Sequence, residues 1–250
     1  MTKIISRLLL LSIIFAITFG FFTMQAEATT VPIYPEAGDG TIFAHEATWA
    51  EVHAASTGYS LNIDSNNRYC GVFYDATPYY YIARYGLTFD LSAISGTVSA
   101  VSFYLYPESS NTTPNSDMKV FGYSGANPVT VDDFGSFGDT AYTDTVADGD
   151  TWAYDDYFEF AFNETGIAAV QSALGGNFGV GGREYTHDGV GTTPGTTTYI
   201  MGYYQSYNTE TSKDPYLEVT YTPLADSAPK IPHAGRRLGP LILNHQKIFI

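Results

Sequence analysis

The feature that most constrains the fold of this chain is a two-residue alternation between apolar and polar side chains. Its clearest example places two sets of residues on opposite faces of one strand: Tyr81, Ala83, Tyr85, Leu87 and Phe89 against Ile82, Arg84, Gly86 and Thr88. Short runs rich in Tyr, Phe, Val and Thr repeat this pattern between clusters of Gly, Pro, Asn, Asp and Ser. We therefore predict an all-β fold, an antiparallel β-sandwich in which one face of each strand joins the core.

Six further strands are predicted from the same kind of pattern. Three alternate clearly, with inward sets Val101, Phe103 and Leu105; Phe158, Phe160 and Phe162; and Leu217, Val219 and Tyr221. Opposite these sets lie Ser102, Tyr104 and Tyr106; Tyr157, Glu159 and Ala161; and Tyr216, Glu218 and Thr220. Weaker signals predict strands near 119–123, 177–181 and 198–205.

One short helix interrupts this series of strands. Ile167, Val170 and Leu174 have helical spacing within Thr165 to Leu174, and Gly175-Gly176 follows as a stop signal. Asn163 and Thr165 are both candidates for the N-cap. We expect this helix to be a crossover between strands.

The two ends of the chain differ from the part between them. Lys3 and Arg7 precede an apolar run of 15 residues, 8–22, and Ala26-Glu27-Ala28 follows, so residues 1–28 are predicted to be a secretory signal peptide. An uncleaved anchor is the alternative, although a spanning helix needs about 20 residues. Residues 29–222 are expected to form one sandwich domain. Residues 223–250 form a basic tail with several Pro and Gly, which either folds back on the acidic domain or supplies one more strand.

The predicted domain is strongly acidic. Of the 11 Lys and Arg, two lie before residue 29 and four after residue 222, which leaves five between them. Only Glu27 and Asp226 of the 26 acidic residues lie outside 29–222, so this stretch carries 24 acids and a formal charge of −19. Such a surface repels nucleic acid and anionic lipid, so we expect neither as a partner.

Cys70 is the chain's single cysteine, so no internal disulfide can form. Two roles are open for it: a small buried apolar side chain, or an intermolecular disulfide in an oxidising compartment.

The order of several motifs resembles the DNRLRE-type jelly-roll domains, which are grouped with carbohydrate-binding modules. The strongest matches are Arg84 to Ser92, with its R-x-x-L-x-F-D-L-S pattern, and the closing strand Pro215 to Tyr221. Of the name-giving motif only Arg183-Glu184 is present, preceded by Gly181-Gly182. The resemblance spans about 37–222. It implies a jelly-roll fold and a carbohydrate-binding role.

The motifs of common enzyme classes are missing from the sequence. The serines lack a Gly-x-Ser-x-Gly elbow, and His45, His53 and His187 have no metal-binding spacing. No phosphate loop or dinucleotide motif is present. We therefore predict a chain that is not an enzyme and needs no cofactor, with a polysaccharide lyase or hydrolase as the weaker alternative. The acidic loop between Asp144 and Asp156 leaves a structural calcium ion open.

Sugar binding needs flat aromatic faces with planar hydrogen-bonding groups beside them. The candidate residues chosen on this basis are Trp49, Tyr79, Tyr80, Arg84, Arg183, Tyr203, Tyr204 and Tyr207. Each also has a structural alternative: Trp49 can seal the core, and Arg84 can be a buried arginine paired with a carboxylate.

We therefore expect a secreted or cell-surface module that binds a polysaccharide or surface glycan. The alternative is a structural component of a cell surface, filament or virus-like particle that self-associates through its C-terminal tail.

Overall fold

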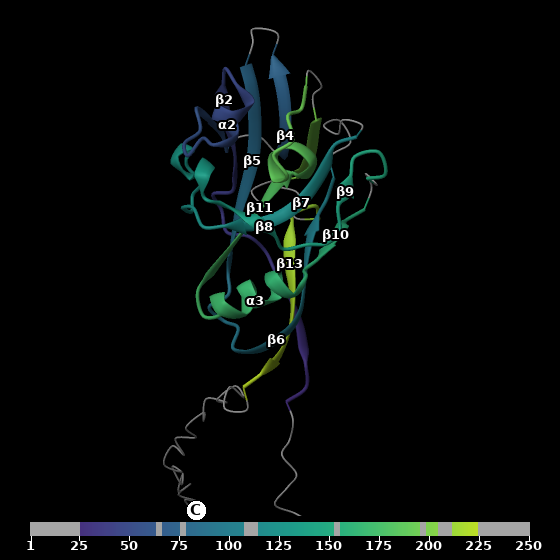
Figure 1. The fold of residues 1–250 in the computed structure, drawn as a ribbon. Coiled ribbons are helices and arrows are strands. Elements are labelled where there is room, and N and C mark those ends of the chain that lie inside the picture. Colours follow the sequence, from purple (N-terminus) through teal and green to yellow (C-terminus); the bar gives the residue numbers. More distant parts are fainter. Residues whose placement is uncertain are drawn as a thin grey trace, which may run out of the picture.

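The computed structural model describes residues 26–63, 67–75, 79–107, 115–152, 156–195, 199–204 and 212–224. These residues form two antiparallel sheets packed face to face, with a few short helices (Figure 1). The predicted all-β sandwich is confirmed. No helix among the described residues is both long enough and apolar enough to cross a membrane.

The smaller sheet has four strands in the order β1-β13-β6-β10. Their bounds are β1 Thr29–Ile33, β6 Gly96–Leu105, β10 Phe158–Ala161 and β13 Tyr216–Pro223. Leu217 of β13 pairs with Ile33 on one side and with Phe103 on the other, and Phe103 pairs with Phe160. This register points Phe103, Phe160 and Leu217 toward the other sheet, because paired residues share one face.

The larger sheet has nine strands, of which β12-β4-β5-β11-β7-β8 form one path. Strand β2 joins at β5, β3 at β2 and β9 at β7. Their bounds are β2 Gly40–Glu46, β3 Ser60–Asn62, β4 Asn67–Asp75, β5 Tyr79–Asp90, β7 Asp117–Tyr123, β8 Phe137–Ala141, β9 Ala147–Asp148, β11 Asn177–Glu184 and β12 Tyr199–Tyr204. In Figure 1, β4 and β5 extend beyond the four-stranded sheet at the top of the molecule.

The helical segments within the described ranges are α2 Trp49–His53, the 3-10 helix η1 Val131–Gly135, α3 Glu164–Ala173 and the π-helical turn η2 Tyr185–Gly189. Helix α3 is the predicted crossover, since it joins β10 of one sheet to β11 of the other. Its N-cap is Asn163, whose side chain accepts from the Gly166 N–H at 3.1 Å. Gly175 follows with φ +81°, a backbone conformation that glycine adopts without strain.

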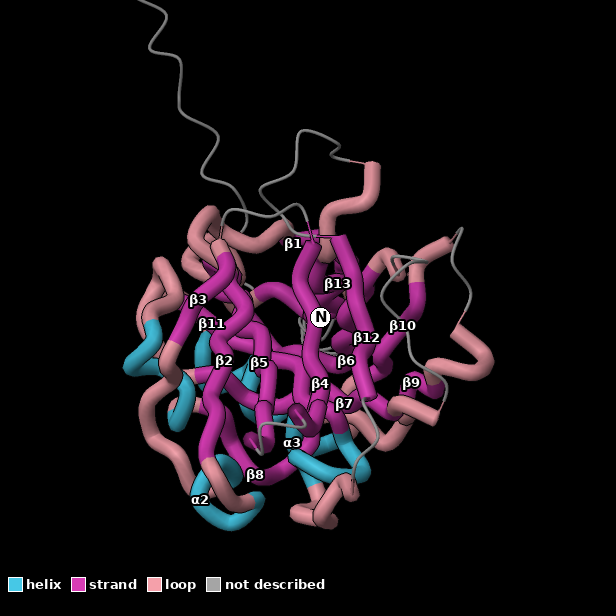
Figure 2. Tube along the Cα trace, turned by 90° about the horizontal axis from the view of Figure 1, so that it is seen from above, coloured by secondary structure: helices cyan, strands magenta, loops and turns pink. Residues whose placement is uncertain are grey.

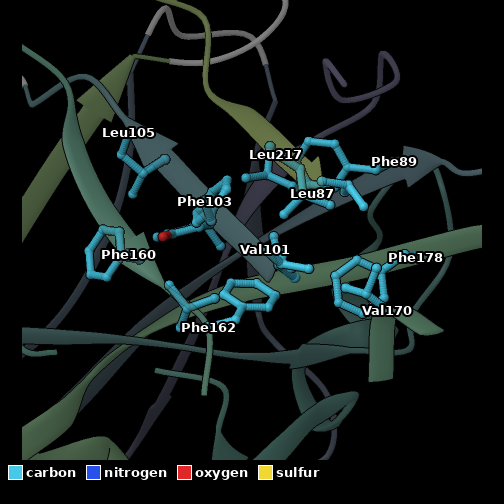
Figure 3. Close-up of a cluster of buried hydrophobic side chains, with 14 of the residues drawn as sticks. Leu87, Phe89, Val101, Phe103, Leu105, Phe160, Phe162, Val170, Phe178 and Leu217 are labelled. Carbon is cyan, nitrogen blue, oxygen red and sulfur yellow. The ribbon is translucent and has the colours of Figure 1, made fainter. Parts of the chain in front are cut away.

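The main core lies between the two sheets and mixes aliphatic and aromatic side chains (Figure 3). Leu87 and Phe89 of β5 and Phe178 of β11 face Phe103 and Leu217 of the smaller sheet. Phe89 meets Phe103 edge to face, with ring centroids 6.0 Å apart. Val170 places α3 against the same core, so the helix closes one end of the sandwich.

A second core covers the outer face of the larger sheet, which the sequence did not predict. Ile42 of β2 and Ile82 of β5 pack there against Val52 of α2 and Phe134 of η1. Every residue of β5 from Ile82 to Phe89 is therefore buried, so the expectation of a single core face on this strand was wrong. The reason is that segments distant in sequence fold over this face; Figure 2 shows α2 on the side away from β1 and β13.

All seven predicted strands and the predicted helix are present, with ends shifted by a few residues. Cys70 is free and fully buried, and its burial raises the pKa of the thiol well above the usual value. It therefore behaves as a small apolar side chain. The predicted signal peptide falls almost entirely in residues 1–25, and most of the basic tail in 225–250; both ranges lie outside the described residues.

Candidate functional site

Two of the predicted sugar-binding residues lie beside each other near α2. Trp49 is only 8% exposed, and its Nε1 donates a hydrogen bond to the Gly191 carbonyl at 3.2 Å. Its ring lies 6.1 Å from that of Tyr80, which is half-buried and also contacts Tyr74. Trp49 therefore seals the second core, which is the structural alternative considered for it.

The two predicted arginines come together inside the protein. Arg84 and Arg183 are 4% and 3% exposed, and both bind the carboxylate of Asp188, which is fully buried. Arg84 donates to Asp188 through Nε at 2.9 Å and Nη2 at 2.6 Å, and Arg183 through Nε at 3.0 Å and Nη2 at 3.1 Å. Their guanidinium groups are committed to this network and to backbone carbonyls, so they are not offered to a ligand at the surface.

The Asp188 network holds the covering segments onto the larger sheet. Arg84 also donates to the Phe134 carbonyl of η1 at 2.9 Å, and the His53 imidazole of α2 is 2.8 Å from the Asp188 carbonyl oxygen. Burial alone would raise the pKa of Asp188, but Arg84 and Arg183 outweigh it and hold that pKa well below its usual range. This arrangement is a paired buried charge with a structural role.

A second buried carboxylate, that of Glu184, also has a structural role. The carboxylate of Glu184 accepts hydrogen bonds from the backbone N–H groups of Thr186, His187 and Asp188, which fixes the π-helical turn η2. Burial raises the pKa of Glu184, although His187 and these N–H groups favour its charged form. Arg183-Glu184, the part of the name-giving motif that this sequence contains, thus lies in the protein interior.

Tyr79 belongs to a separate aromatic group at the projecting end of β5, which we call the His45 group and which consists of His45, Tyr59, Phe73, Tyr79 and Tyr81. It is 39% exposed and lies 5.1 Å from the His45 ring, which also contacts Tyr59 at 4.0 Å and Tyr81 at 5.3 Å. Phe73 stacks on Tyr81. Tyr203 and Tyr204 lie on β12, with side chains that are not described, and Tyr207 lies outside the described residues.

Among the described residues, the most extensive group of tyrosines that reach solvent lies on the outer face of the four-stranded sheet. We call it the tyrosine surface, and it consists of Tyr34, Tyr104, Tyr106, Tyr157 and Tyr216. Tyr34 is 55% exposed and the other four are partly exposed. The register explains the gathering: Tyr104 and Tyr216 are paired residues on β6 and β13, and both point away from the core that holds Phe103 and Leu217.

The rings of the tyrosine surface form one continuous contact chain. Tyr104 and Tyr216 stack with centroids 4.5 Å apart at an interplanar angle of 11°. Tyr157 stands nearly perpendicular to both, at 6.5 and 5.2 Å, and its other neighbour is Tyr106 at 5.3 Å. Tyr34 extends the chain beyond Tyr216 at 5.9 Å. Mutual packing restricts the rotamers of these side chains, so less entropy is lost when a ligand binds them.

Hydrogen-bonding groups border the tyrosine surface. Glu159 pairs with Tyr104 across β10 and β6, and it accepts a hydrogen bond from the Ser102 hydroxyl at 2.6 Å. Glu218 pairs with Ser102 across β13 and β6. On the opposite border the Tyr157 hydroxyl donates to the carbonyls of Ser212 and Asp214, at 3.1 and 2.9 Å. Rings and polar groups therefore share one face of the sheet.

The surroundings of Tyr104, Tyr157 and Tyr216 keep their hydroxyls protonated. Burial, and then Glu159 and Glu218, raise the pKa of Tyr104 to about 12. Burial and the neighbouring tyrosines and Asp214 raise the pKa of Tyr157 to about 12. The pKa of Tyr216 is also raised, by burial and then by Glu218. Each of these hydroxyls is therefore a neutral donor and acceptor throughout the physiological pH range.

Sequence reasoning placed four of these tyrosines opposite the apolar sets but did not choose them as site residues. Tyr104 and Tyr106 alternate with Phe103 and Leu105, Tyr157 with Phe158, and Tyr216 with Leu217. What was missing was the strand order, which brings β6, β10 and β13 side by side. Four outward tyrosine positions on three predicted strands were the available signal.

Within the described residues, no group of three or more His, Cys, Asp or Glu side chains is arranged to hold a metal ion. Part of the acidic loop, residues 153–155, lies outside the description, so the calcium expectation stays a prediction.

Comparison with known proteins gives little further guidance. No protein-family model and no curated protein matches the chain, so the resemblance to DNRLRE-type domains stays a prediction. Among solved structures, a xylan-binding module, CBM15, matches with 13% sequence identity and a TM-score of 0.33, over 79% of this chain and 100% of that one. A TM-score and identity this low establish no shared function.

Proposed function

We propose that this chain is a secreted, non-catalytic module that binds a polysaccharide through the tyrosine surface. The observation that carries the proposal is the continuous chain of five partly exposed tyrosine rings on one sheet face, bordered by Ser102, Glu159 and Glu218. Aromatic rings pack against the C–H faces of sugars, and carboxylates and hydroxyls beside them bind sugar hydroxyls.

The location of the surface supports a polymeric ligand. A strand rises about 3.3 Å per residue and neighbouring strands lie about 4.8 Å apart. Rings on β6 and β13 and on the segments next to β1, β6 and β10 therefore cover more than one sugar unit. A binding site on an exposed sheet face also lets a long polysaccharide extend beyond the site at both of its ends. A small molecule would gain more from a closed pocket.

The proposal is tested by affinity gel electrophoresis on a panel of soluble polysaccharides, with Tyr34→Ala and Tyr104→Ala as variants. We expect the unaltered protein to be retarded by at least one polymer, and each variant to bind about tenfold more weakly, as is typical for an aromatic side chain that contacts the ligand. Tyr59→Ala is the matched control, because Tyr59 is 53% exposed against 55% for Tyr34 but belongs to the His45 group.

Two results would contradict the proposal. One is an unretarded protein on every polymer of the panel. The other is retardation that Tyr59→Ala abolishes and the two tyrosine-surface variants leave unchanged, which would move the binding site to the His45 group.

A further inference from the structure

The charge around the tyrosine surface restricts which polysaccharides it can accept. Glu159 and Glu218 border the rings, and Asp214 begins the approach to β13. The four strands that form this face, β1, β6, β10 and β13, contain no Lys or Arg. An acidic polymer would bring like charges to these carboxylates, which is unfavourable.

Cations are almost absent from the whole surface of the domain. Five Lys and Arg lie in 29–222, and three of them, Arg68, Arg84 and Arg183, are buried. The two that reach solvent are Lys119 and Lys213. This stretch therefore presents two ammonium groups to solvent together with most of its 24 acidic residues.

Both of these ammonium groups lie over tyrosine rings. The Lys119 Nζ is 4.3 Å from the ring centroid of Tyr185. The Lys213 Nζ is 5.3 Å from the ring centroid of Tyr106, within the tyrosine surface itself. An ammonium group over an aromatic face is attracted by the negative potential of the ring. The chain itself thus supplies an example of the group that this surface accepts.

From these contacts we propose that the tyrosine surface selects glycan polymers that carry free amino groups over the same polymers in neutral form, and excludes acidic ones. The inference rests on the proposed function, whose ligand class it specifies. Ammonium groups of the polymer lie over tyrosine faces beside Glu159 and Glu218, while the sugar rings pack against the remaining aromatic surface. Lys213 occupies one end of this surface and competes with the ligand there.

The test uses one polymer in two forms: glycol chitosan, with free amines, and the same glycol chitosan after N-acetylation, which is neutral and stays soluble. Polygalacturonate is the acidic comparison. Binding is measured by affinity electrophoresis at a pH below the pKa of the polymer's amines. Two salt concentrations, about 0.02 M and about 0.2 M, are compared because they screen charge–charge interactions to very different extents. We expect the amine form to bind roughly tenfold more tightly than the acetylated form at low salt, with no binding of polygalacturonate.

Three variants locate the preference. Glu159→Gln/Glu218→Gln should reduce it to about twofold, since the charges beside the rings are removed. Glu46→Gln/Glu51→Gln makes the same change in net charge at exposed positions near α2 and should leave most of it intact. Lys213→Gln should strengthen amine-polymer binding about threefold, because it removes a competing ammonium group.

The outcomes separate this inference from the proposed function. Equal binding of the two chitosan forms, with loss of both in Tyr34→Ala, would overturn the amine preference and leave polysaccharide binding in place. A preference reduced equally by the two double variants, or binding of chitosan that Tyr34→Ala does not change, would show general charge attraction and also overturn it. If no polymer binds, the proposed function fails as well.

Discussion

The outer faces of the two sheets differ in what lies over them and therefore in what their side chains can do. On the nine-stranded sheet, α2, η1 and η2 cover the face, and Trp49, Arg84 and Arg183 are buried beneath or within them. On the four-stranded sheet, Tyr34, Tyr104 and Tyr216 keep part of their surface in solvent. Residue types suited to binding thus occur on both faces, but Trp49, Arg84 and Arg183 of the first face are buried and committed to structural contacts.

The largest expected effect of a substitution is on the covered face, at Asp188. Asp188→Asn removes the charge that compensates Arg84 and Arg183, and leaving a buried charge without its partner costs about 3–5 kcal/mol of unfolding free energy. Urea unfolding at pH 7 measures the loss. Asp139→Asn is the control, because this carboxylate also contacts Arg183, at 3.4 Å, but its side chain is 99% exposed. A stability equal in the two variants would contradict the structural role given to the network.

The pH dependence of the Asp188 contribution follows from the direction of its pKa. The folded-state pKa lies below the ordinary value, so the stabilisation is complete at neutral pH and is lost as pH falls through the acid range toward the folded pKa. The stability difference between the unaltered protein and Asp188→Asn should therefore shrink in acid. A difference that grows as the pH falls would contradict this assignment.

The second effect in size sharpens the contrast between aromatic residues of the two faces. Trp49→Ala should destabilise the fold by about 3 kcal/mol, because it empties part of the second core, and leave polysaccharide binding unchanged. Tyr34→Ala should do the reverse, with a change in unfolding free energy within about 0.5 kcal/mol. Unfolding curves and affinity electrophoresis on the same preparations check both. Loss of binding in folded Trp49→Ala would place the ligand on the covered face.

Substitution of Asp214 should change the unfolding free energy less than substitution of Asp188, and in the opposite direction. Burial, and then the charge of Asp39, raise its pKa to about 6 from an ordinary value of 3.8, and its Oδ1 makes no hydrogen bond. The folded state therefore holds a proton that the unfolded state releases, so the stability from this group is present at low pH and declines as pH rises through 4 to 6. Asp214→Asn should raise the unfolding free energy at pH 8 by up to about 2 kcal/mol, with little change near pH 4.

Chemical denaturation at the two pH values measures this difference. Asp188 and Asp214 are then a pair of buried aspartates with opposite pH behaviour, one beside two arginines and one near a second carboxylate. An Asp214→Asn protein that is less stable than the unaltered chain at pH 8 would show that the charged form makes favourable contacts.

The sequence predicted the sandwich more fully than it predicted the site. Alternation is a local property, so it located the strands and placed Tyr104 outward from Phe103. The Arg84–Asp188 pair joins residues 104 positions apart, and nothing local marks Asp188 as the partner. The stacking of Tyr104 on Tyr216 likewise depends on β6 lying beside β13.

Besides contacts between distant residues, the alternation of apolar and polar residues could not show which polar side chains are buried. Arg84, on the face opposite Leu87, was compatible both with solvent and with a buried ion pair, and the covering segments α2, η1 and η2 decide between the two. Gly182 illustrates the same dependence, because a Cβ at that position would overlap the ring of Tyr85. The need for glycine at this position follows only from the pairing of β5 with β11, which places Gly182 opposite Tyr85.

The most direct test of the central claim is ¹⁹F NMR of the protein carrying fluorotyrosine, with resonances assigned through single Tyr→Phe variants and titrated with the polysaccharide that binds most tightly. We expect the resonances of Tyr34, Tyr104 and Tyr216 to shift when the polysaccharide binds, and those of Tyr59 and Tyr79 to stay in place. Movement confined to Tyr59 and Tyr79 would contradict it.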